Sequence, residues 1–243
     1  MRIYQSAIEA VKEIERDLWE MGHKVKTRTY QDKHVEDDEG FQSKELVAYS
    51  FTLTDGKDWQ DIFSTLGMKD HNSCIAYVLE EFVRRIDPNF PLTELNPGVS
   101  YLNREEIWKK FLEPNGKFSY TYPERIHGSM QREALERLHH FDTQSRQLLL
   151  TIYEQSIDSA RRGGRRRVPC TMYYQALHRD KELYLIDNMR SCDLYTHFGI
   201  DLSIAWLMAD YFKFAWRAEC AKLVMQIGSL HAFEKDMKLR KIF

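Results

Sequence analysis

The sequence predicts an α+β domain in which helices pack on a mixed sheet, and three observations support this. Segments with apolar residues at helical spacing are interspersed with β-branched and aromatic segments, without the regular period of a βαβ array. The 243 residues are 43% hydrophobic and 13% aromatic, as in a globular chain with a large core. No linker, repeat or low-complexity segment divides the chain, so residues 1–243 are expected to form a single domain.

The N-terminal region predicts a helix followed by a strand. Apolar residues recur at helical spacing from Ile3 to Leu18, and Gly22 is a suitable end for that helix. Residues 45–56 then alternate between polar and apolar types and end in Asp-Gly, which predicts a strand leading into a turn.

A second amphipathic helix is predicted over residues 74–86. Its apolar face is expected to carry Ile75, Leu79, Phe82 and Ile86. Glu80 and Glu81 lie off that face. A proline-rich loop over 87–98 and a short helix over 104–116 are expected to follow.

The C-terminal half predicts two helices and four strands. The helices are expected over 130–141 and 201–218, and the strands over 146–156, 170–179, 181–190 and 222–233. A charged Arg-Asp-Lys turn joins the two middle strands. The helix over 201–218 is the most apolar, so we expect it at the centre of the domain.

Charge, cysteine content and the lack of long apolar segments argue against several classes of protein. A formal net charge of -2 argues against a dedicated nucleic-acid-binding domain, which is usually strongly basic. The four cysteines form no C-x-x-C pair, so no metal site is expected. The N-terminus is amphipathic and lacks a secretory leader, and no apolar run is long enough to span a membrane. We therefore expect a reduced, cytoplasmic protein without a membrane partner.

An arginine-rich stretch leads into a cysteine at residues 161–175, RRGGRRRVPCTMYYQ. The arginines of 161–167 could bind nucleic acid, although a charged loop is most often only solvated. Alternatively, guanidinium charge near Cys170 favours its thiolate, which is the nucleophilic form. Taken alone, Cys170 also fits a small buried apolar residue, as most free cysteines are.

Two further clusters carry groups that suit an anionic ligand. Arg190 and Ser191 can both donate hydrogen bonds to a phosphate, and Asp193 can orient a neighbour. His231 follows a Gly-Ser pair on the last predicted strand. Each cluster has a structural alternative, namely a solvated strand end for 188–193 and a structural histidine for His231.

The order of these clusters resembles the thymidylate synthases and their relatives, the phage deoxycytidylate hydroxymethylases, and the pattern is closest to the latter. The matching residues are Pro169, Cys170, Gln175, Arg190, Ser191, Cys192, Asp193, Asp201 and 228–231. Upstream, VLEEFV, IW at 107–108, YTYPERI and QSRQLLLTIY resemble further family segments. The resemblance is dense from about residue 142 to residue 236 and thin before it.

The resemblance implies the family's mixed sheet packed with helices and a two-fold dimer through the sheet. It implies folate-dependent transfer of a one-carbon unit to carbon 5 of a pyrimidine nucleoside monophosphate, with 5,10-methylene-tetrahydrofolate as co-substrate. Cys170 would add to carbon 6 of the base, and Glu81 would shuttle protons near carbon 4. Helical periodicity leaves Glu80 and Glu81 open, and the Leu-Glu-Glu match favours Glu81.

The resemblance also assigns the nucleotide-binding residues. Phosphate would be held by Arg190, Ser191 and Arg28, and by Arg146 from the partner subunit. The full set implied is Arg28, Arg146, Gln175, Arg190, Ser191, Asp193, Asp201 and His231. Gln147 stands where the family usually has a second arginine, and an arginine of 161–167 could supply that charge.

Asp201 carries the base specificity that the resemblance implies. The synthases have asparagine there and read uracil, whereas the deoxycytidylate hydroxymethylases have aspartate. An aspartate can accept from the 4-amino group of cytosine and, when protonated, donate to its N3. An ionised Asp201 would repel the O4 of uracil, so this site would reject the other base. The structural alternative is that Asp201 caps the following helix.

The folate site and the product follow from the same resemblance. Trp108 and Tyr122 match the family's folate-binding segments. Phe233 replaces a tyrosine that meets the sugar, which leaves His231 to make that contact alone. A short C-terminal segment after 231–236 favours water reaching the exocyclic methylene, and hence hydroxymethylation of dCMP. The alternatives are a divergent thymidylate synthase that methylates dUMP and a nucleic-acid-binding protein with a basic loop.

Overall fold

The computed structural model describes residues 1–30, 33–34, 37, 41–87, 118, 120–128, 130–159 and 168–240. Its main sheet runs in the order β1-β5-β9-β8-β7-β6, with β2 paired to β5 at one edge. The strands of this sheet are β1 (Arg2–Tyr4), β2 (His23–Lys26), β5 (Gln42–Leu53), β6 (Leu149–Thr151), β7 (Thr171–Arg179), β8 (Glu182–Asp193) and β9 (Cys220–Phe233). A separate small sheet pairs β3 (Thr29–Tyr30) with β4 (Lys33–His34).

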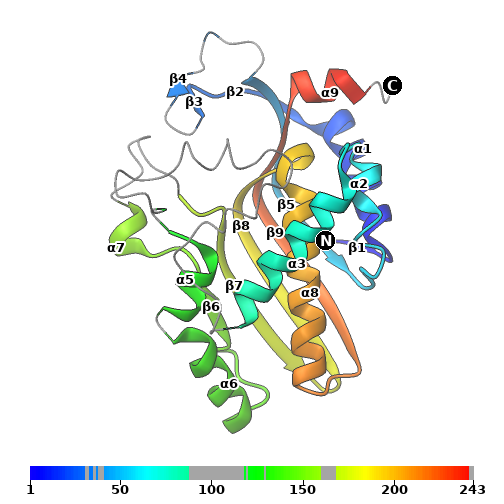
Figure 1. The fold of residues 1–243 in the computed structure, drawn as a ribbon. Helices are drawn as coiled ribbons and strands as arrows, with labels where there is room; N and C mark the ends of the chain where they lie inside the picture. The colour runs from blue at the N-terminus through cyan, green and yellow to red at the C-terminus, as the bar shows by residue number, and fades with distance from the viewer. Residues whose placement is uncertain are drawn as a thin grey trace.

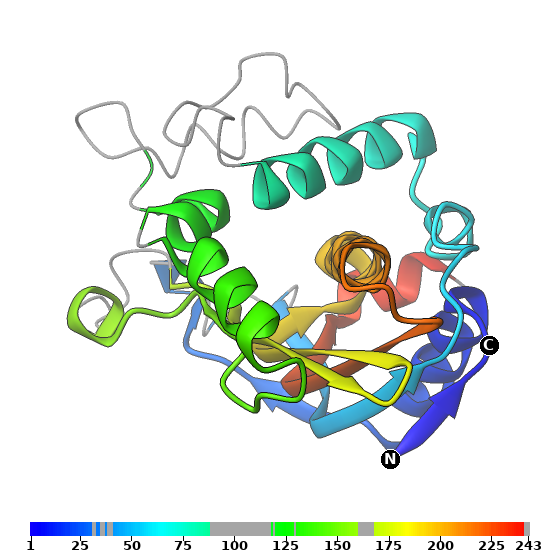
Figure 2. The ribbon, with the colours of Figure 1, turned by 90° about the horizontal axis from the view of Figure 1, so that it is seen from below.

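Helices cover one face of the sheet in two layers. The helices are α1 (Ala7–Met21), α2 (Ile62–Thr65), α3 (His71–Ile86), α5 (Tyr122–His127), α6 (Gln131–Phe141), α7 (Gln155–Asp158), α8 (Gly199–Ala215) and α9 (Glu234–Arg240). Helix α8 lies directly on β8 and β9, and α3 packs on the outer side of α8 (Figures 1 and 2). A five-residue π-helix, Leu194–Phe198, joins β8 to α8.

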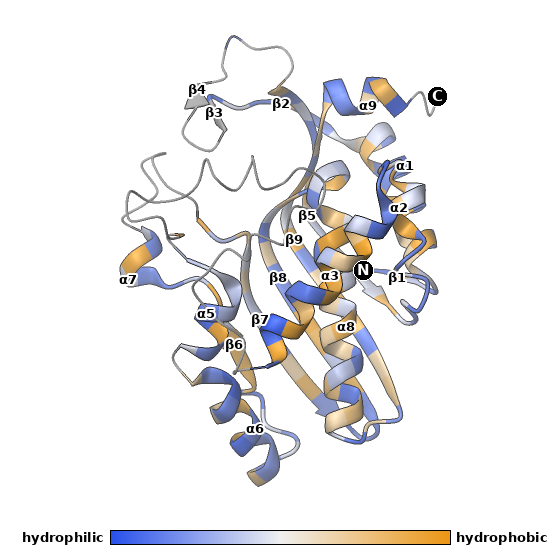
Figure 3. Cartoon of the chain, viewed as in Figure 1, coloured by the Kyte–Doolittle hydropathy of each residue, from blue (hydrophilic) through white to orange (hydrophobic). Residues whose placement is uncertain are grey.

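Helix α8 is central because it is apolar on every side. It buries Leu202, Ile204, Met208 and Phe212, among others, between the sheet and α3. Figure 3 shows the same contrast, since α8 is largely apolar whereas α6 is mostly hydrophilic. Each large apolar side chain that is fully buried contributes about 1.5–3 kcal/mol, so this layer is a main source of stability.

The sheet is mixed, and its two central strands run parallel. β7 and β8 form an antiparallel hairpin whose turn holds Asp180 at a φ of 54°, and β8 pairs with β9 in parallel. The β8–β9 register passes from Met189 opposite Ile227 to Ser191 opposite Ser229. Between these pairs a Cβ on Gly228 would lie 2.9 Å from the Arg190 carbonyl oxygen, so glycine allows this close approach.

Most predicted elements within the described residues are confirmed. The strand expected at 45–56 is β5, the helices expected at 74–86, 130–141 and 201–218 are α3, α6 and α8, and the strands expected at 170–179, 181–190 and 222–233 are β7, β8 and β9. The loop expected over 87–98 and the helix expected over 104–116 lie outside the described residues, as do residues 161–167. Among the described residues, every helix is too short or too polar to cross a membrane.

Two details predicted for the first two amphipathic helices are wrong, namely the start of α1 and the buried face of α3. Ile3 belongs to β1 and not to the first helix, because Ser6 caps α1 by accepting a hydrogen bond from the Glu9 amide. The buried face of α3 also differs from the predicted apolar face, since Leu79 is 43% exposed whereas Arg84 and Arg85 are buried. Tertiary partners for these arginines override the hydrophobic pattern.

The strand predicted over 146–156 forms only over Leu149–Thr151, as β6, and α7 follows it at Gln155–Asp158. At the outer edge of β6, the side-chain amide of Gln131 makes backbone hydrogen bonds of the kind that a neighbouring strand would make. Its Oε1 accepts from the Thr151 backbone N–H at 2.6 Å, and its Nε2 donates to the Thr151 carbonyl at 2.9 Å. The side chain of Gln131 thereby satisfies the outer edge of the sheet at Thr151.

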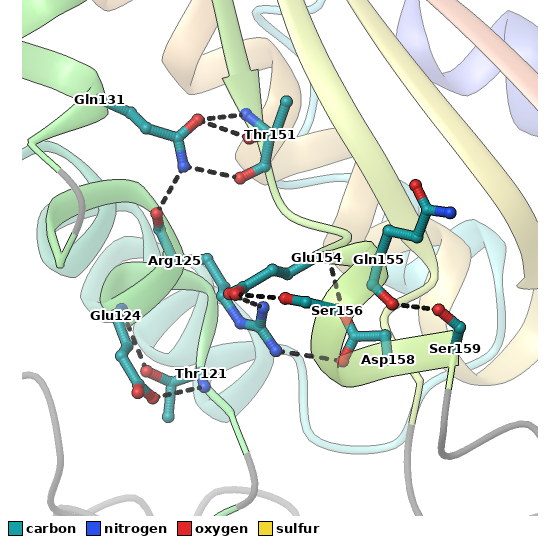
Figure 4. A network of polar contacts seen from close by, with 10 residues as sticks. All are labelled: Thr121, Glu124, Arg125, Gln131, Thr151, Glu154, Gln155, Ser156, Asp158 and Ser159. Atoms are coloured by element: carbon teal, nitrogen blue, oxygen red, sulfur yellow. Dashed lines mark hydrogen bonds and ion pairs between the residues drawn. The ribbon is translucent and has the colours of Figure 1, made fainter.

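An ion-pair network fixes α5 beside this edge (Figure 4). Arg125 of α5 donates to Glu154 at 2.7 Å and to Asp158 at 3.0 Å. Asp158 is fully buried and also accepts from the Glu154 backbone N–H at 2.8 Å. Because Tyr122 begins α5, this network positions the segment that carries Tyr122.

Candidate active site

Cys170 stands immediately before β7, and the Arg190 side chain holds the segment around it. The Arg190 guanidinium donates to the carbonyl oxygens of Pro169 at 2.9 Å and Val168 at 3.0 Å, and its Nη2 lies 3.8 Å from Cys170 Sγ. The Arg190 backbone N–H donates to the Cys170 carbonyl at 2.8 Å. Cys170 is only partly buried, and a guanidinium at this distance favours its thiolate.

The end of β8 places Ser191, Cys192 and Asp193 next to Arg190. Asp193 caps the following π-helix, because its Oδ1 accepts from the Tyr195 backbone N–H at 3.1 Å. Burial raises the pKa of Asp193, and the facing His231 opposes that shift. Asp193 therefore orients its neighbours, as its position in the sequence suggested.

Asp201 lies in the first turn of α8 and is partly exposed. The alternative that it caps the helix is wrong, because α8 follows the π-helix directly and the capping position is Phe198. The Cys192 thiol donates to Asp201 Oδ2 at 3.6 Å. Burial, followed by the Asp201 charge, raises the pKa of Cys192 well above that of a free thiol, so this second cysteine remains protonated.

Tyr122, the first residue of α5, contacts the segment next to Cys170. A capping box between Thr121 and Glu124 starts the helix, with Pro123 in its first turn. The Tyr122 hydroxyl accepts from the Thr171 backbone N–H at 3.3 Å, one residue beyond Cys170. Burial raises the pKa of Tyr122 well above its usual value, with smaller contributions from Tyr120, Cys170 and Asp201, so its phenol stays neutral.

Glu80 and Glu81 have different arginine partners in the structure, although helical periodicity did not distinguish between them. Glu80 accepts from Arg84 at 2.7 Å, in a pair within α3. Glu81 faces Arg85 at 3.8 Å, and the Arg85 guanidinium lies 4.4 Å from the centre of the Tyr122 ring. Through Arg85 and Tyr122, Glu81 is therefore connected to the Cys170 segment.

A buried polar cluster under this site was missed by the sequence analysis. Arg85 is 4% exposed and donates to the Tyr174 hydroxyl at 2.7 Å. Asp187 of β8 is fully buried nearby, and its charge interacts with both Arg85 and Asp201. The spacing of Glu81 and Arg85, four residues apart on a helix, was a signal for part of this cluster.

Two other residues of the predicted site, Arg146 and Arg28, are exposed. The Gln175 side-chain amide donates to the Arg146 carbonyl oxygen at 2.9 Å. Arg28 follows β2. Trp108 and the arginines of 161–167 lie outside the described residues.

His231 and Phe233 project from the end of β9. Their rings make an edge contact with centroids 5.7 Å apart, and Phe233 is buried against Phe41. Phe233 therefore supports the His231 ring by packing. His231 Nδ1 also lies 3.5 Å from the Ser229 hydroxyl, which places the Gly-Ser-Leu-His segment beside the end of β8.

The site combines a thiol, a guanidinium and partly exposed carboxyls that come from β8, α3, α8 and the segment just before β7. Cys170 lies beside Arg190, and Asp201 and Glu81 come from two different helices. Such a set can activate a sulfur nucleophile, bind an anion and exchange protons. No cluster of three or more His, Cys, Asp or Glu residues suited to a metal ion is found in the part of the chain that the structure describes.

Comparison with known proteins supports the fold. No protein-family model and no curated protein sequence matches the chain. Among solved structures, the chain is similar to the thermostable thymidylate synthase A from Bacillus subtilis, with a TM-score of 0.65 and 13% sequence identity. The match covers 97% of this chain and 83% of that protein, so the thymidylate-synthase-like fold extends over the whole domain.

Proposed function

We propose that this protein transfers a one-carbon unit from 5,10-methylene-tetrahydrofolate to carbon 5 of a pyrimidine nucleoside monophosphate, and that it hydroxymethylates dCMP. The observation that carries this proposal is the Cys170 thiol held 3.8 Å from Arg190, at a strand end that also gathers Ser191 and Asp193. The thymidylate-synthase-like fold supports the same reaction class. Fold alone does not fix function, so the residues carry the argument.

Cys170 is the proposed nucleophile. Its thiolate adds to carbon 6 of the base, and the electron pair of the ring double bond makes carbon 5 nucleophilic. Carbon 5 bonds to the methylene carbon, tetrahydrofolate leaves, and carbon 5 loses its proton. Water then adds to the exocyclic methylene as Cys170 departs, which gives the hydroxymethyl product without oxidation of the folate. Arg190 stabilises the thiolate before addition and after release.

Asp201 is the proposed reader of the base. Its carboxyl is partly exposed at the start of α8 and is held by the Cys192 thiol at 3.6 Å. A carboxyl can accept from the 4-amino group of cytosine, whereas the O4 of uracil would face it as an acceptor. Glu81, held by Arg85, is the proposed proton-shuttling group.

The active protein is proposed to be a homodimer in which Arg146 enters the partner's phosphate site. In this chain Gln175 fixes the backbone at Arg146 and leaves the guanidinium exposed. Mixing Cys170→Ser and Arg146→Ala proteins tests this arrangement. Random exchange should restore about a quarter of wild-type activity, because half of the dimers hold one intact site of two. Activity that never exceeds the sum of the two variants would contradict a shared site.

The central experiment follows tritium release from carbon-5-labelled dCMP or dUMP in the presence of methylene-tetrahydrofolate, together with dihydrofolate formation. The proposal expects release from dCMP without dihydrofolate. Cys170→Ser should abolish release, whereas Cys220→Ser should not, because Cys220 lies beside Glu182 at the opposite end of β9. Dihydrofolate formed with dUMP would instead indicate a thymidylate synthase, which the fold similarity keeps as the alternative.

Asp201→Asn tests the base assignment separately. Asparagine donates from its amide nitrogen and accepts at its oxygen, which matches uracil better than cytosine. We expect the ratio of kcat/KM for dCMP over dUMP to fall by about a hundredfold or more, since unpaired polar groups in a site reject a ligand strongly. An unchanged ratio would remove Asp201 from the role of base reader.

A further inference from the structure

Arg85 is a buried arginine to which the proposed reaction assigns no step. It lies in the last turn of α3, and only 4% of it is exposed. A charged side chain is costly to bury unless surrounding groups pair with it. The contacts that compensate for this burial therefore indicate what Arg85 does in the fold.

Two tyrosines from separate elements hold the Arg85 guanidinium. Its Nη1 donates to the hydroxyl of Tyr174 in β7 at 2.7 Å. Its Cζ lies 4.4 Å from the centre of the ring of Tyr122, the first residue of α5. A planar guanidinium can donate hydrogen bonds from its edge while its face lies on an aromatic ring, so arginine suits both contacts at once.

Tyr174 is a fixed anchor for Arg85 because it belongs to the interior of the sheet. It is 2% exposed, and it pairs with Leu150 of β6 on one side and with Asp187 of β8 on the other. Burial is the main cause that raises the pKa of Tyr174 above that of a free phenol. Its hydroxyl is therefore neutral and can accept the hydrogen bond from Arg85.

Tyr122 extends this anchoring to the segment of the proposed nucleophile. Its hydroxyl accepts from the Thr171 backbone N–H at 3.3 Å, and Thr171 follows Cys170 directly. The Tyr122 side chain is thus held at two places, at its ring by Arg85 and at its hydroxyl by Thr171. A change at Arg85 should consequently release the ring and weaken the contact beside Cys170.

We propose that Arg85 is a positioning residue that holds Tyr122 against the Cys170 segment, with Tyr174 as its anchor. The consequence for catalysis rests on the proposed function, in which Tyr122 contacts the folate co-substrate. Arg85 acts through Tyr122, whereas the proposed phosphate contacts come from Arg190 and its neighbours on β8. Loss of Arg85 should therefore weaken the use of folate and leave nucleotide binding almost unchanged.

Hydrogen exchange at the Thr171 amide tests the contact without any substrate. Arg85→Met should accelerate this exchange about tenfold, because the Tyr122 hydroxyl is no longer held at that amide. The Ala176 amide, which donates to the Leu148 carbonyl at 2.9 Å, serves as a reference on the same strand. Global destabilisation would accelerate both amides. Tyr122→Phe should accelerate Thr171 alone, and adding Arg85→Met to it should accelerate Thr171 no further.

Steady-state tritium release from dCMP measures the consequence for the reaction. In Arg85→Met the KM for methylene-tetrahydrofolate should rise about tenfold, as expected when a buried cation–π contact is lost. The KM for dCMP should change less than about twofold. Arg84→Met is the matched control, because Arg84 is the neighbouring buried arginine and pairs with Glu80 at 2.7 Å. It should lower Tm and change neither KM.

The outcomes separate the inference from the proposed function. Faster exchange at Thr171 but not at Ala176, together with a selective rise in the folate KM, supports the inference. Unchanged exchange at Thr171, equal acceleration of both amides, or an unchanged folate KM overturns it and leaves the proposed function intact. A wild type that releases tritium from neither dCMP nor dUMP overturns the proposed function, while exchange at Thr171 still decides the contact. If Arg85→Met fails to fold, Arg85→Lys decides in the same way, because it keeps the charge and loses the planar fork.

Discussion

Arg125→Met should destabilise the domain strongly, because it leaves a buried carboxylate without its cation. Arg125 contacts two acids that differ in exposure, since the Glu154 side chain is 50% exposed and the Asp158 side chain 0%. The exposed pair contributes about 0–1 kcal/mol. A buried charge-assisted bond contributes about 1.5–3 kcal/mol, and removing one partner of a buried pair costs about 3–5 kcal/mol. We therefore expect a loss of about 3 kcal/mol or more in the free energy of unfolding.

Thermal unfolding measures this loss. For a domain of this size, about 3 kcal/mol corresponds to a fall in Tm of about 6–12 °C. Two controls isolate the buried contact. Glu154→Gln removes only the half-exposed partner, and Lys181→Met breaks an exposed pair whose side chains are 72% and 67% exposed. Each control should change the free energy of unfolding by less than about 1 kcal/mol.

The reasoning would be refuted if Arg125→Met changed Tm no more than these controls. That result would mean that water or a protonated Asp158 compensates for the lost cation. The double variant with Asp158→Asn distinguishes the two contributions. If the pair carries the effect, the double variant should be less destabilised than the sum of the single variants, because the buried charge is gone as well.

Three other predictions test packing and electrostatics, two of them near the site. Gly228→Ala should cost about 1–3 kcal/mol in urea unfolding, because the added Cβ would lie 2.9 Å from the Arg190 carbonyl oxygen, and an unchanged midpoint would refute that contact. Arg190→Gln should slow alkylation of Cys170 by iodoacetamide near neutral pH, because it removes the guanidinium that favours the reactive thiolate, and an equal rate would contradict that role. Burial lowers the pKa of His139 to about 4, with neighbouring histidines adding to the effect, so the folded state binds fewer protons than the unfolded state between about pH 6.5 and pH 4. Stability should fall as pH decreases through that window, and His139→Phe, which keeps an aromatic ring on Trp216, should show a weaker fall by denaturant titration at several pH values.

Elements with a strong local pattern were predictable from sequence. The helix α8 is apolar on all sides, and the strands β7, β8 and β9 are rich in apolar and aromatic residues between clear turns. The order of Cys170, Arg190 and Asp201 along the chain also contributed to the resemblance that implies a nucleophile, an anion contact and a base reader, and these roles stay predictions. These features depend on neighbours in the sequence, which is why a sequence reveals them.

Elements that depend on distant partners were not predictable. Residues 146–156 form only a short strand whose outer edge at Thr151 is bonded by Gln131, and no local pattern indicates that contact. The buried arginines of α3 were equally hidden, since a charged residue on a helix is normally assigned to solvent.

The sequence by itself determined the chemical groups of this site and the strands and helices that carry them. Only the tertiary structure decided that Glu80 pairs with Arg84 whereas Glu81 faces Arg85, and that Asp201 does not cap its helix. It also decided that Asp187 is fully buried and that neither of its oxygens has a hydrogen-bond partner among the described residues. The physical reason is that protonation and hydrogen bonding depend on the groups that folding brings together, and Arg85 and Tyr174 are 89 residues apart in the chain.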